Sequence, residues 1–270
     1  MSQDIIDYYG TAFDEDSRVR TVARFEYVRT KEIIGRYLTP DPMMILDVSG
    51  ATGAYAFWLA GLGHRVHLRD LVPRHIEIAR ARARELSIPL ESMEAGDARI
   101  LPYPDGFADL VLLMGPLYHL QERAGRIAAL VESARVLKPG GRIFCAAISR
   151  FGSLFSGFQL KLLDDPRFEA IVDQDLRDGR HENIAPDKDY WTTAYFHQPA
   201  ELRDEVAAAG LTCEKLIGVE GPVGLMKDLD DWIDKRDKYY EFALKYMKRV
   251  EEEESLLGAS YHLLAVARKV

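Results

Sequence analysis

Residues 43–53 read Met-Met-Ile-Leu-Asp-Val-Ser-Gly-Ala-Thr-Gly, and this stretch decides the fold. Its first half is an apolar run with one acid, Asp47, and predicts a buried strand. Its second half is a loop of small residues, from Ser49 to Gly53, that leads into the helix-like segment 54–60. Small residues let the backbone approach a ligand closely, and the N–H groups at a helix N-terminus bind polar groups. The stretch therefore predicts a nucleotide-type binding site.

Downstream of this stretch, predicted strands alternate with predicted helices. Short apolar runs are separated by amphipathic segments, with Gly and Pro between them. The strands are expected at residues 65–70, 90–95, 108–114, 142–148, 211–219 and 261–267, and the helices at 53–62, 73–86, 122–137 and 199–209. The run Lys138-Pro139-Gly140-Gly141 is expected to form a tight turn. This alternation predicts a Rossmann-like, doubly wound α/β fold with a mostly parallel sheet and helices on both faces.

The chain divides into four expected segments. They are residues 1–42, an N-terminal helical cap; residues 43–148, a ligand-binding α/β core; residues 149–196, an insertion over the cleft; and residues 197–270, which complete the sheet. The cap is expected to hold a short amphipathic helix followed by a loop within residues 3–15, and a second helix at 19–38, where apolar residues recur near helical spacing. The last segment is expected to carry one long charged helix at 228–254.

The composition narrows the class of protein. Apolar residues make up 47% of the 270 residues and charged residues 29%, as in ordinary globular proteins. A net charge of −8 argues against nucleic acid as a partner. No apolar run reaches the roughly 18 residues that span a bilayer, and the N-terminus has no signal-peptide pattern. We therefore expect a cytoplasmic protein without a membrane partner, and the oligomeric state stays open.

Three acids follow successive predicted strands. Asp47 lies at the end of the first strand, Asp70 at the end of the second, and Asp97 just after the third. In an open parallel sheet, ligands bind beyond the carboxyl ends of the strands. Asp70 is placed to accept both hydroxyls of a ribose, Asp97 to accept from an exocyclic amine, and Asp47 to hold an ammonium. Each acid alone could equally be a turn former or a helix cap, but three in register favour a ligand site.

A nicotinamide cofactor does not match the small-residue loop. Its pyrophosphate would require the spacing Gly-x-Gly-x-x-Gly at the start of the helix. Ser49-Gly50-Ala51-Thr52-Gly53 lacks that spacing, and the loop has no Lys-Ser or Lys-Thr pair for a phosphate.

The chain resembles the class I S-adenosylmethionine-dependent methyltransferases, strongly over residues 20–148 and weakly over the C-terminal strands. The motifs that carry the resemblance are an ordered set, which makes them more specific than any one alone. They are Ile45 to Gly53, Val66 to Pro73, Gly96-Asp97-Ala98, Leu101 to Pro104, Phe107 to Val111 and Arg135 to Gly141.

The resemblance implies S-adenosylmethionine as the cofactor, a seven-stranded sheet with an antiparallel last strand, and a role for each motif. The first loop would hold the methionine part with Asp47, Ser49, Gly50, Ala51 and Gly53. Asp70, followed by Leu71, would meet the ribose, and Asp97 with Ala98 the adenine. Met114 and Gly115 would line the floor below the sulfonium.

One departure from the family concerns the loop. The family usually shows Asp-x-Gly-x-Gly-x-Gly, whereas this chain has Ser49 and Ala51 at the first two glycine positions, and only Gly53 matches. A Cβ at each position narrows the approach to the ligand. We expect cofactor binding to be retained but weakened.

Candidate residues for binding the methyl acceptor lie just after the fourth predicted strand and in the flanking segments. His119 is a candidate base for proton removal, and Tyr118 is a candidate to orient the acceptor; both also fit simple packing roles. Tyr9 and Trp191 are candidate substrate contacts, again with packing as the alternative. No metal-ligand spacing is evident, and the Asp/Asn-Pro-Pro-Tyr motif of amino-directed DNA methyltransferases is missing after the fourth strand.

The sequence as a whole predicts an S-adenosylmethionine-dependent enzyme that methylates a nitrogen, oxygen or carbon of a small-molecule acceptor. Two alternatives stay open. The first is a cofactor-binding regulatory module that no longer catalyses, suggested by Ser49 and Ala51. The second is a tRNA or protein methyltransferase, which predicts a basic face around the pocket.

Overall fold

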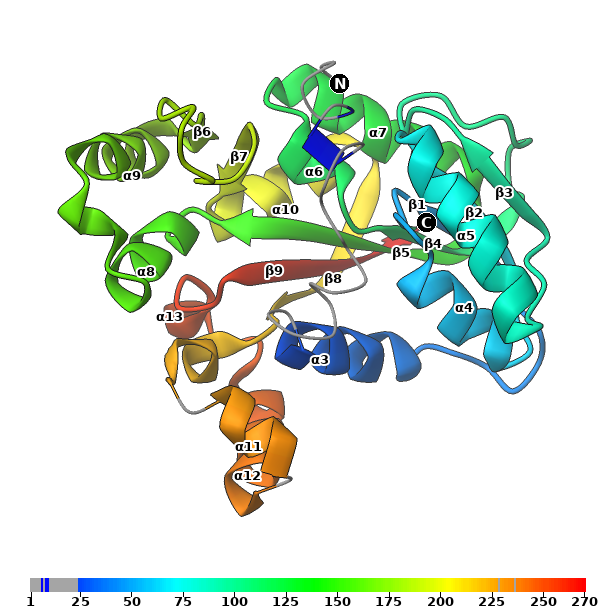
Figure 1. Ribbon diagram of the computed structural model, residues 1–270. Coiled ribbons are helices and arrows are strands. Elements are labelled where there is room, and N and C mark those ends of the chain that lie inside the picture. The colour runs from blue at the N-terminus through cyan, green and yellow to red at the C-terminus, as the bar shows by residue number, and fades with distance from the viewer. Residues whose placement is uncertain (1–5, 7, 10–23, 228, 236) are drawn as a thin grey trace.

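A computed structural model of the chain describes residues 6, 8–9, 24–227, 229–235 and 237–270. Its strands form one sheet in the order β3-β2-β1-β4-β5, which β9 and then β8 continue beyond β5 (Figure 1). The strands are β1 (Met44–Val48), β2 (Arg65–Asp70), β3 (Ser92–Ala95), β4 (Ala108–Leu113), β5 (Leu137–Ser149), β6 (Arg180–His181), β7 (Ala194–His197), β8 (Leu211–Gly218) and β9 (His262–Lys269). Strands β1 to β5 pair in parallel, while β9 is antiparallel to both β5 and β8. The predicted Rossmann-like sheet with an antiparallel last strand is confirmed.

Helices cover both faces of the sheet. One face packs against α3 (Arg24–Gly35), α4 (Ala54–Gly61) and α5 (Pro73–Leu86). The other packs against α7 (Arg123–Val136) and α10 (Pro199–Ala208) (Figure 1). Because β1 and β4 are buried between the two layers, their sequences are almost continuously apolar. Asp47 is the exception in β1, which makes this residue the first to examine for function.

The N-terminal cap is only partly described. Residues 6, 8 and 9 are helical, and the rest of the expected helix within residues 3–15 lies outside the described residues. Helix α3 begins at Arg24, so residues 19–23 of the second expected helix also lie outside them. From Arg24 onward, α3 buries Ile33 and Ile34 against the sheet.

The predicted tight turn at residues 138–141 is wrong. Helix α7 runs directly into β5, which is continuous from Leu137 to Ser149. The Gly-rich run is instead an irregularity inside the strand: Gly140 has φ 78°, and the register with β4 shifts between Ala108 and Leu110. The strand absorbs the extra residues because β4 pairs with it on both sides of the shift.

Residues 149–196 leave the sheet at the end of β5 and return to it through β7. The segment contains α8 (Gly152–Gln159), η1 (Leu162–Asp164) and α9 (Pro166–Asp178), and the strand pair β6 and β7 follows. It has a small apolar cluster of its own around Phe168, Ile171 and Tyr190. Strand β7 pairs with the last residues of β5, with Phe196 opposite Ile148.

The single long helix predicted at 228–254 is also wrong. The structure has α11 (Leu229–Lys235) and α12 (Lys238–Val250) within this region and α13 (Glu254–Leu257) at its end, and η2 (Gly221–Leu225) precedes it. Asp237 caps a new helix start by accepting the Tyr239 N–H, and Glu253 is extended and caps α13. Glu251, just after α12, forms a buried ion pair with Arg29 at 2.6 Å. None of the helices in the described ranges combines the length and apolar character needed to cross a bilayer.

Candidate cofactor site

The loop after β1 has an unusual backbone. Ser49, Ala51 and Gly53 all have positive φ, at 63°, 48° and 88°. Hydrogen bonds hold the loop in place: the N–H groups of Ser49 and Gly50 donate to the Arg69 carbonyl, at 2.8 and 3.1 Å. A side chain at positive φ costs on the order of 1 kcal/mol, and this is the conformation that glycine favours. Ser49 and Ala51, which stand where the family pattern has glycine, therefore adopt the backbone conformation of a glycine although they carry side chains.

Asp47 lies beneath this loop and is fully buried. Neither carboxylate oxygen has a hydrogen-bond partner of good geometry in the described part of the chain. Burial, and then the charge of Asp70, raises the pKa of Asp47 to about 7, against a smaller opposing effect of the Ala56 N–H. A Cβ at Gly50 would lie 2.4 Å from Asp47 Oδ2, so this glycine is needed for the loop to close over the acid.

Asp70 lies at the end of β2 and already accepts three hydrogen bonds. Its Oδ2 accepts the Ala51 N–H at 2.9 Å, which ties it to the loop after β1. Its Oδ1 accepts the Val72 N–H at 2.9 Å and lies 2.9 Å from His75 Nδ1. Leu71, also expected at the ribose, is half-buried beside it. The structure thus brings Asp47, Asp70 and the loop together, as the sequence predicted.

Asp97 follows β3 and is engaged by Arg99. Its carboxylate accepts the Arg99 backbone N–H at 2.9 Å and the guanidinium Nη2 at 2.6 Å. Partial burial would raise the pKa of Asp97, but the bonds from Arg99 outweigh it and hold the pKa below its usual value. Ala98, next in the chain, is buried in the core. The sequence did not indicate Arg99 as the partner of this acid.

The segment after β4 meets the loop after β1. Gly115 lies so close to Ser49 that a Cβ there would be 3.1 Å from the Ser49 Cβ. Met114 is half-buried beside it, and its carbonyl accepts a 2.6 Å bond from the Tyr118 hydroxyl. Tyr118, in α6 (Pro116–His119), therefore uses its hydroxyl to hold the backbone next to the predicted sulfonium floor.

Three rings from separate elements gather next to this segment. The Tyr9 ring lies edge-on to His119, with centroids 5.3 Å apart, and edge-on to His75, at 6.0 Å. His119 also contacts Tyr118, at 4.8 Å. Tyr9 and His119, both predicted from the sequence, are thus brought together beside Asp70 and its partner His75.

Trp191 is placed apart from this group. It lies in the 149–196 segment, where its ring contacts Phe168 at 6.0 Å and His181 at 5.9 Å. These contacts belong to the segment's own aromatic cluster. Among the described residues, no ring contact links Trp191 to the loop after β1.

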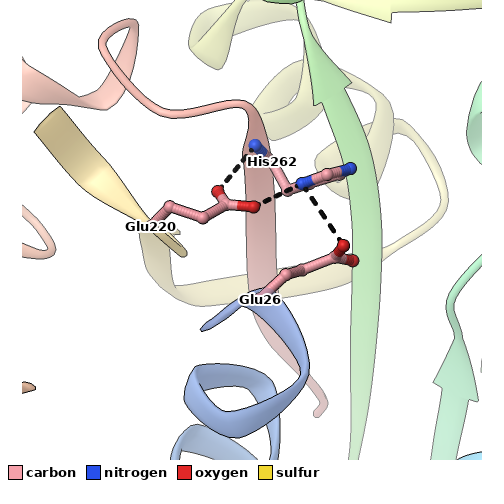
Figure 2. Close-up of side chains that lie close together, drawn as sticks. All are labelled: Glu26, Glu220 and His262. Carbon is pink, nitrogen blue, oxygen red and sulfur yellow. Dashed lines mark hydrogen bonds and ion pairs between the residues drawn. The ribbon is translucent and has the colours of Figure 1, made fainter. Parts of the chain in front are cut away.

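A second polar cluster, at the β8–β9 edge, was missed by the sequence analysis. Figure 2 shows Glu26 from α3, Glu220 after β8 and His262 at the start of β9 pointing toward one another. Glu220 Oε1 lies 2.5 Å from His262 Nδ1, and Glu26 Oε2 lies 3.7 Å from the same nitrogen. Ser260 donates a further bond to Glu220 at 2.8 Å.

The geometry of this cluster suits either of two uses. One candidate ligand atom from each of the three residues lies within 4.8 Å of the others, a spacing that ligands of a metal ion share. However, Glu220 already receives the His262 imidazole, the His262 N–H and Ser260. Glu220 is strongly buried, yet the His262 charge and these bonds hold its pKa below the usual value. We therefore interpret the cluster as a structural ion pair between Glu220 and His262, which Glu26 joins and so links α3 to the edge of the sheet.

His75 and this cluster could not be found by strand-end patterns alone. His75 has a local signal: it lies five residues after Asp70, in the first turn of α5, where side chains lean back toward the preceding strand. The second polar cluster has no local signal, because each pair among Glu26, Glu220 and His262 is more than 40 residues apart in the sequence. These residues meet only because of the order of the strands in the sheet.

The strand order, the small-residue loop and the acids beside it define a Rossmann-like nucleotide-binding α/β domain. A family model described as a methyltransferase domain matches residues 46–145, which hold the loop and these acids. The fold is that of a SAM-dependent methyltransferase from Methanosarcina mazei, with a TM-score of 0.62, 18% identity, and coverage of 88% of this chain and 97% of that one. Residues 46–145 therefore match a methyltransferase domain, and the chain has the fold of S-adenosylmethionine-dependent methyltransferases.

Curated relatives match over the same part of the chain. A demethylmenaquinone methyltransferase from Deinococcus radiodurans is 35% identical over 144 residues, covering 50% of this chain and 56% of that protein. The ubiquinone/menaquinone biosynthesis C-methyltransferase UbiE of Zymomonas mobilis is 35% identical over 117 residues, covering 42% and 45%. The chain thus spans about half the length of the curated relatives it matches.

The residues present fit the cofactor of this family. The Asp47 carboxylate is fully buried and has no well-formed hydrogen bond to any residue that the structure describes, so a cationic or donor group would stabilise it. S-adenosylmethionine carries such a group, its ammonium. Gly50 keeps the space above this acid free of a side chain. A direct bond joins the loop to Asp70, and Asp47 lies beneath the loop, so the same few residues can bind both the amino-acid and the nucleoside parts of the cofactor.

Proposed function

We propose that this protein transfers a methyl group from S-adenosylmethionine to a nitrogen, oxygen or carbon of a small-molecule acceptor. One observation carries the proposal: a fully buried carboxylate, Asp47, without a well-formed hydrogen bond among the described residues, lies under a loop whose backbone brings Ser49, Ala51 and Gly53 into left-handed conformations. A fold alone does not determine an activity. A buried acid without a partner is costly, and a cationic ligand at this position offsets the cost.

Each part of the site has a proposed role toward the cofactor. Asp47 binds the ammonium of the methionine part, and the Ser49–Gly53 loop encloses that part. The ribose binds next to Asp70, and the adenine binds next to Asp97 and Ala98. Met114 and Gly115 lie under the sulfonium. When bound, the cofactor supplies an electrophilic methyl group.

The proposed acceptor side is the ring cluster near α6. His119 accepts a proton from the acceptor where the attacked atom carries one, and Tyr9 covers the reacting groups. Tyr118 acts through the backbone, because its hydroxyl holds the Met114 carbonyl in place. The hydrogen bond of Tyr118 supports this indirect role and not a direct contact with the acceptor. Trp191 remains a proposed acceptor contact that its packing against Phe168 does not favour.

The acceptor is proposed to be a small molecule. The net charge of −8 supports this choice over a nucleic acid. The names of the curated relatives make a quinone-type ring the first acceptor to test, with methylation at carbon.

A second candidate function is a cofactor-binding module without turnover. Ser49 and Ala51 favour it, because both add a Cβ at positive φ where the family pattern has glycine. Such a module would bind S-adenosylmethionine but convert none of it.

A turnover assay distinguishes these functions. Purified protein is incubated with methyl-labelled S-adenosylmethionine and a panel of reduced quinones, phenols and amines, and S-adenosylhomocysteine is measured. Acceptor-dependent product supports the methyltransferase. Cofactor binding without product from any acceptor supports the module, and neither binding nor product would overturn both.

A further inference from the structure

Helix α12 carries a stripe of exposed aromatic rings that the proposed function does not use. Tyr239, Phe242 and Tyr246 follow one another at helical spacing and are 51%, 43% and 48% exposed. The ring centroids of Tyr239 and Phe242 are 5.9 Å apart, and those of Phe242 and Tyr246 are 6.2 Å apart. The three rings therefore form one continuous aromatic stripe. Large apolar side chains that gather on a surface in this way mark an interaction site.

Another face of α12 already holds the helix on the molecule. Ala243 is buried in a small apolar cluster with Phe25 of α3 and Leu229 of α11. Leu244 and Met247 pack against the same cluster. Figure 1 shows α11 and α12 projecting from the body of the molecule, below α3 in that view. Because this face anchors α12, the aromatic stripe is presented outward, where a partner outside the chain can reach it.

Unpaired cations flank the stripe. Lys238, Lys245 and Arg249 are exposed, and none of them forms an ion pair with a residue that the structure describes. The ammonium groups of Lys238 and Lys245 lie 5.6 and 5.4 Å from the centroids of the neighbouring tyrosine rings of the stripe. Glu241 is the only acid within α12. The outward side of α12 thus combines aromatic rings with an excess of positive charge.

The described acids next to the stripe are engaged in bonds of their own. In α11, Asp231 pairs with Lys235 at 2.8 Å, and Asp234 pairs with Arg24 of α3. Asp237 accepts a backbone N–H at the start of α12 at 2.9 Å. The net charge of −8 opposes an anionic surface at long range. Charges more than about 10 Å away are largely screened at ordinary salt concentrations, so the cations beside the stripe dominate at contact.

An anionic lipid surface matches this combination of groups. Aromatic rings at a membrane surface lie at the level of the headgroups, where a tyrosine keeps its hydroxyl in water. Lysine and arginine side chains extend along an apolar surface while their charges reach anionic headgroups. A second copy of the chain matches less well. A two-fold interface through the stripe would bring the same cations of both copies together, and like charges repel.

We propose that α12 docks this protein on membranes that contain anionic lipids, with Tyr239, Phe242 and Tyr246 at the level of the headgroups. The flanking cations contact the lipid phosphates, so the docking needs no membrane-spanning segment. The proposal goes beyond the proposed function and does not depend on it. It also differs from the expectation of no membrane partner, which considered runs long enough to span a bilayer and not a stripe on the surface of a helix.

Vesicle co-sedimentation of the full chain tests the proposal. Vesicles of phosphatidylcholine alone are compared with vesicles that also contain phosphatidylglycerol. The protein should sediment with the anionic vesicles, and less at high salt. Phe242→Ser and Lys245→Glu should each weaken this binding about tenfold, by the loss of buried ring area and by the reversal of one charge. Val131→Ser and Arg177→Glu make comparable changes at exposed positions of α7 and α9, and should leave the binding unchanged.

The possible outcomes decide between this partner and a second copy of the chain. Weaker binding by both α12 variants, with the controls unchanged, supports the proposal. No sedimentation of the wild type with the anionic vesicles overturns it, and so does binding that Phe242→Ser and Lys245→Glu both retain. Light scattering is measured on the same proteins. A wild-type dimer that Phe242→Ser converts to a monomer, without any vesicle binding, would overturn the proposal and assign the stripe to a second copy. Lys245→Glu changes only an exposed charge, so it keeps the test decisive if Phe242→Ser disturbs the fold.

Discussion

Replacing Asp47 by Asn should make the ligand-free protein more stable, which is unusual for a buried polar residue. Burial and the charge of Asp70 raise the pKa of Asp47 to about 7 from an ordinary value of 3.8. In the folded protein the ionised form is therefore disfavoured. The cost of ionisation is absent below pH 3.8, grows as the pH rises, and is complete above pH 7, where it reaches about 4 kcal/mol.

The pH dependence of the difference is the sharper quantity. Asn is neutral at every pH, so Asp47→Asn lacks this cost. Its free energy of unfolding relative to wild type should rise by about 2.5 kcal/mol between pH 5 and pH 8. A constant offset from the buried amide does not affect this slope. Titrating groups distant from Asp47 are common to both proteins and cancel in the comparison.

Urea denaturation of both proteins at pH 5, 6, 7 and 8 measures this difference. In parallel, the variant should bind S-adenosylhomocysteine more weakly, since it lacks the negative charge for the ammonium. A stability difference that is flat with pH would refute the argument, because it would mean that Asp47 titrates normally in the folded protein. A variant less stable than wild type at pH 8 would contradict the predicted gain in stability, whereas the slope with pH tests the titration of Asp47 by itself.

Three further predictions concern other parts of the molecule. Ser49→Gly and Ala51→Gly remove side chains from positive φ, so each should stabilise the protein by up to about 1 kcal/mol in urea denaturation and tighten cofactor binding; weaker binding would contradict the strain argument. His119→Gln should lower the rate of methyl transfer without changing S-adenosylhomocysteine affinity, and unchanged turnover at all pH values would exclude it as the base. Glu220→Gln should cost about 3 kcal/mol near neutral pH by leaving His262 without its carboxylate. That loss should fade as the pH falls below 4.5 through the lowered folded-state pKa of Glu220.

Local patterns were sufficient to predict the core. The strand at 65–70 and the helix at 73–86 were predicted with the bounds that the structure shows. Hydrophobic periodicity and the helix-starting Pro73 act within a few residues, so the sequence displays them directly. The loop after β1 was likewise evident from its small residues, although its positive φ angles were not.

The errors came from interactions between distant segments. The helix predicted at 228–254 breaks where Asp237 and Glu253 each cap a new helix start, and Glu251 between them is held by Arg29, which is 222 positions away. The run Lys138–Gly141 looks like a turn, but pairing with β4 holds it in β5. Propensity predicts what a segment favours alone, and these partners override it.

The same distinction applies to the candidate site. Asp47, Asp70 and Asp97 could be found because parallel strands end at one edge of the sheet. Their partners were not evident: Arg99 at Asp97, and His75 with the Ala51 N–H at Asp70. Whether an acid is satisfied or unpartnered decides its role, and only the folded arrangement shows this.

The central claim is that the loop after β1, with Asp47 beneath it, binds S-adenosylmethionine. Titration calorimetry of S-adenosylhomocysteine into the wild-type protein at pH 8 tests it most directly. We expect S-adenosylhomocysteine to bind at a single site, S-adenosylmethionine to displace it, and Asp47→Asn to weaken its binding. No binding heat at ligand concentrations up to the millimolar range, together with no displacement, would contradict it.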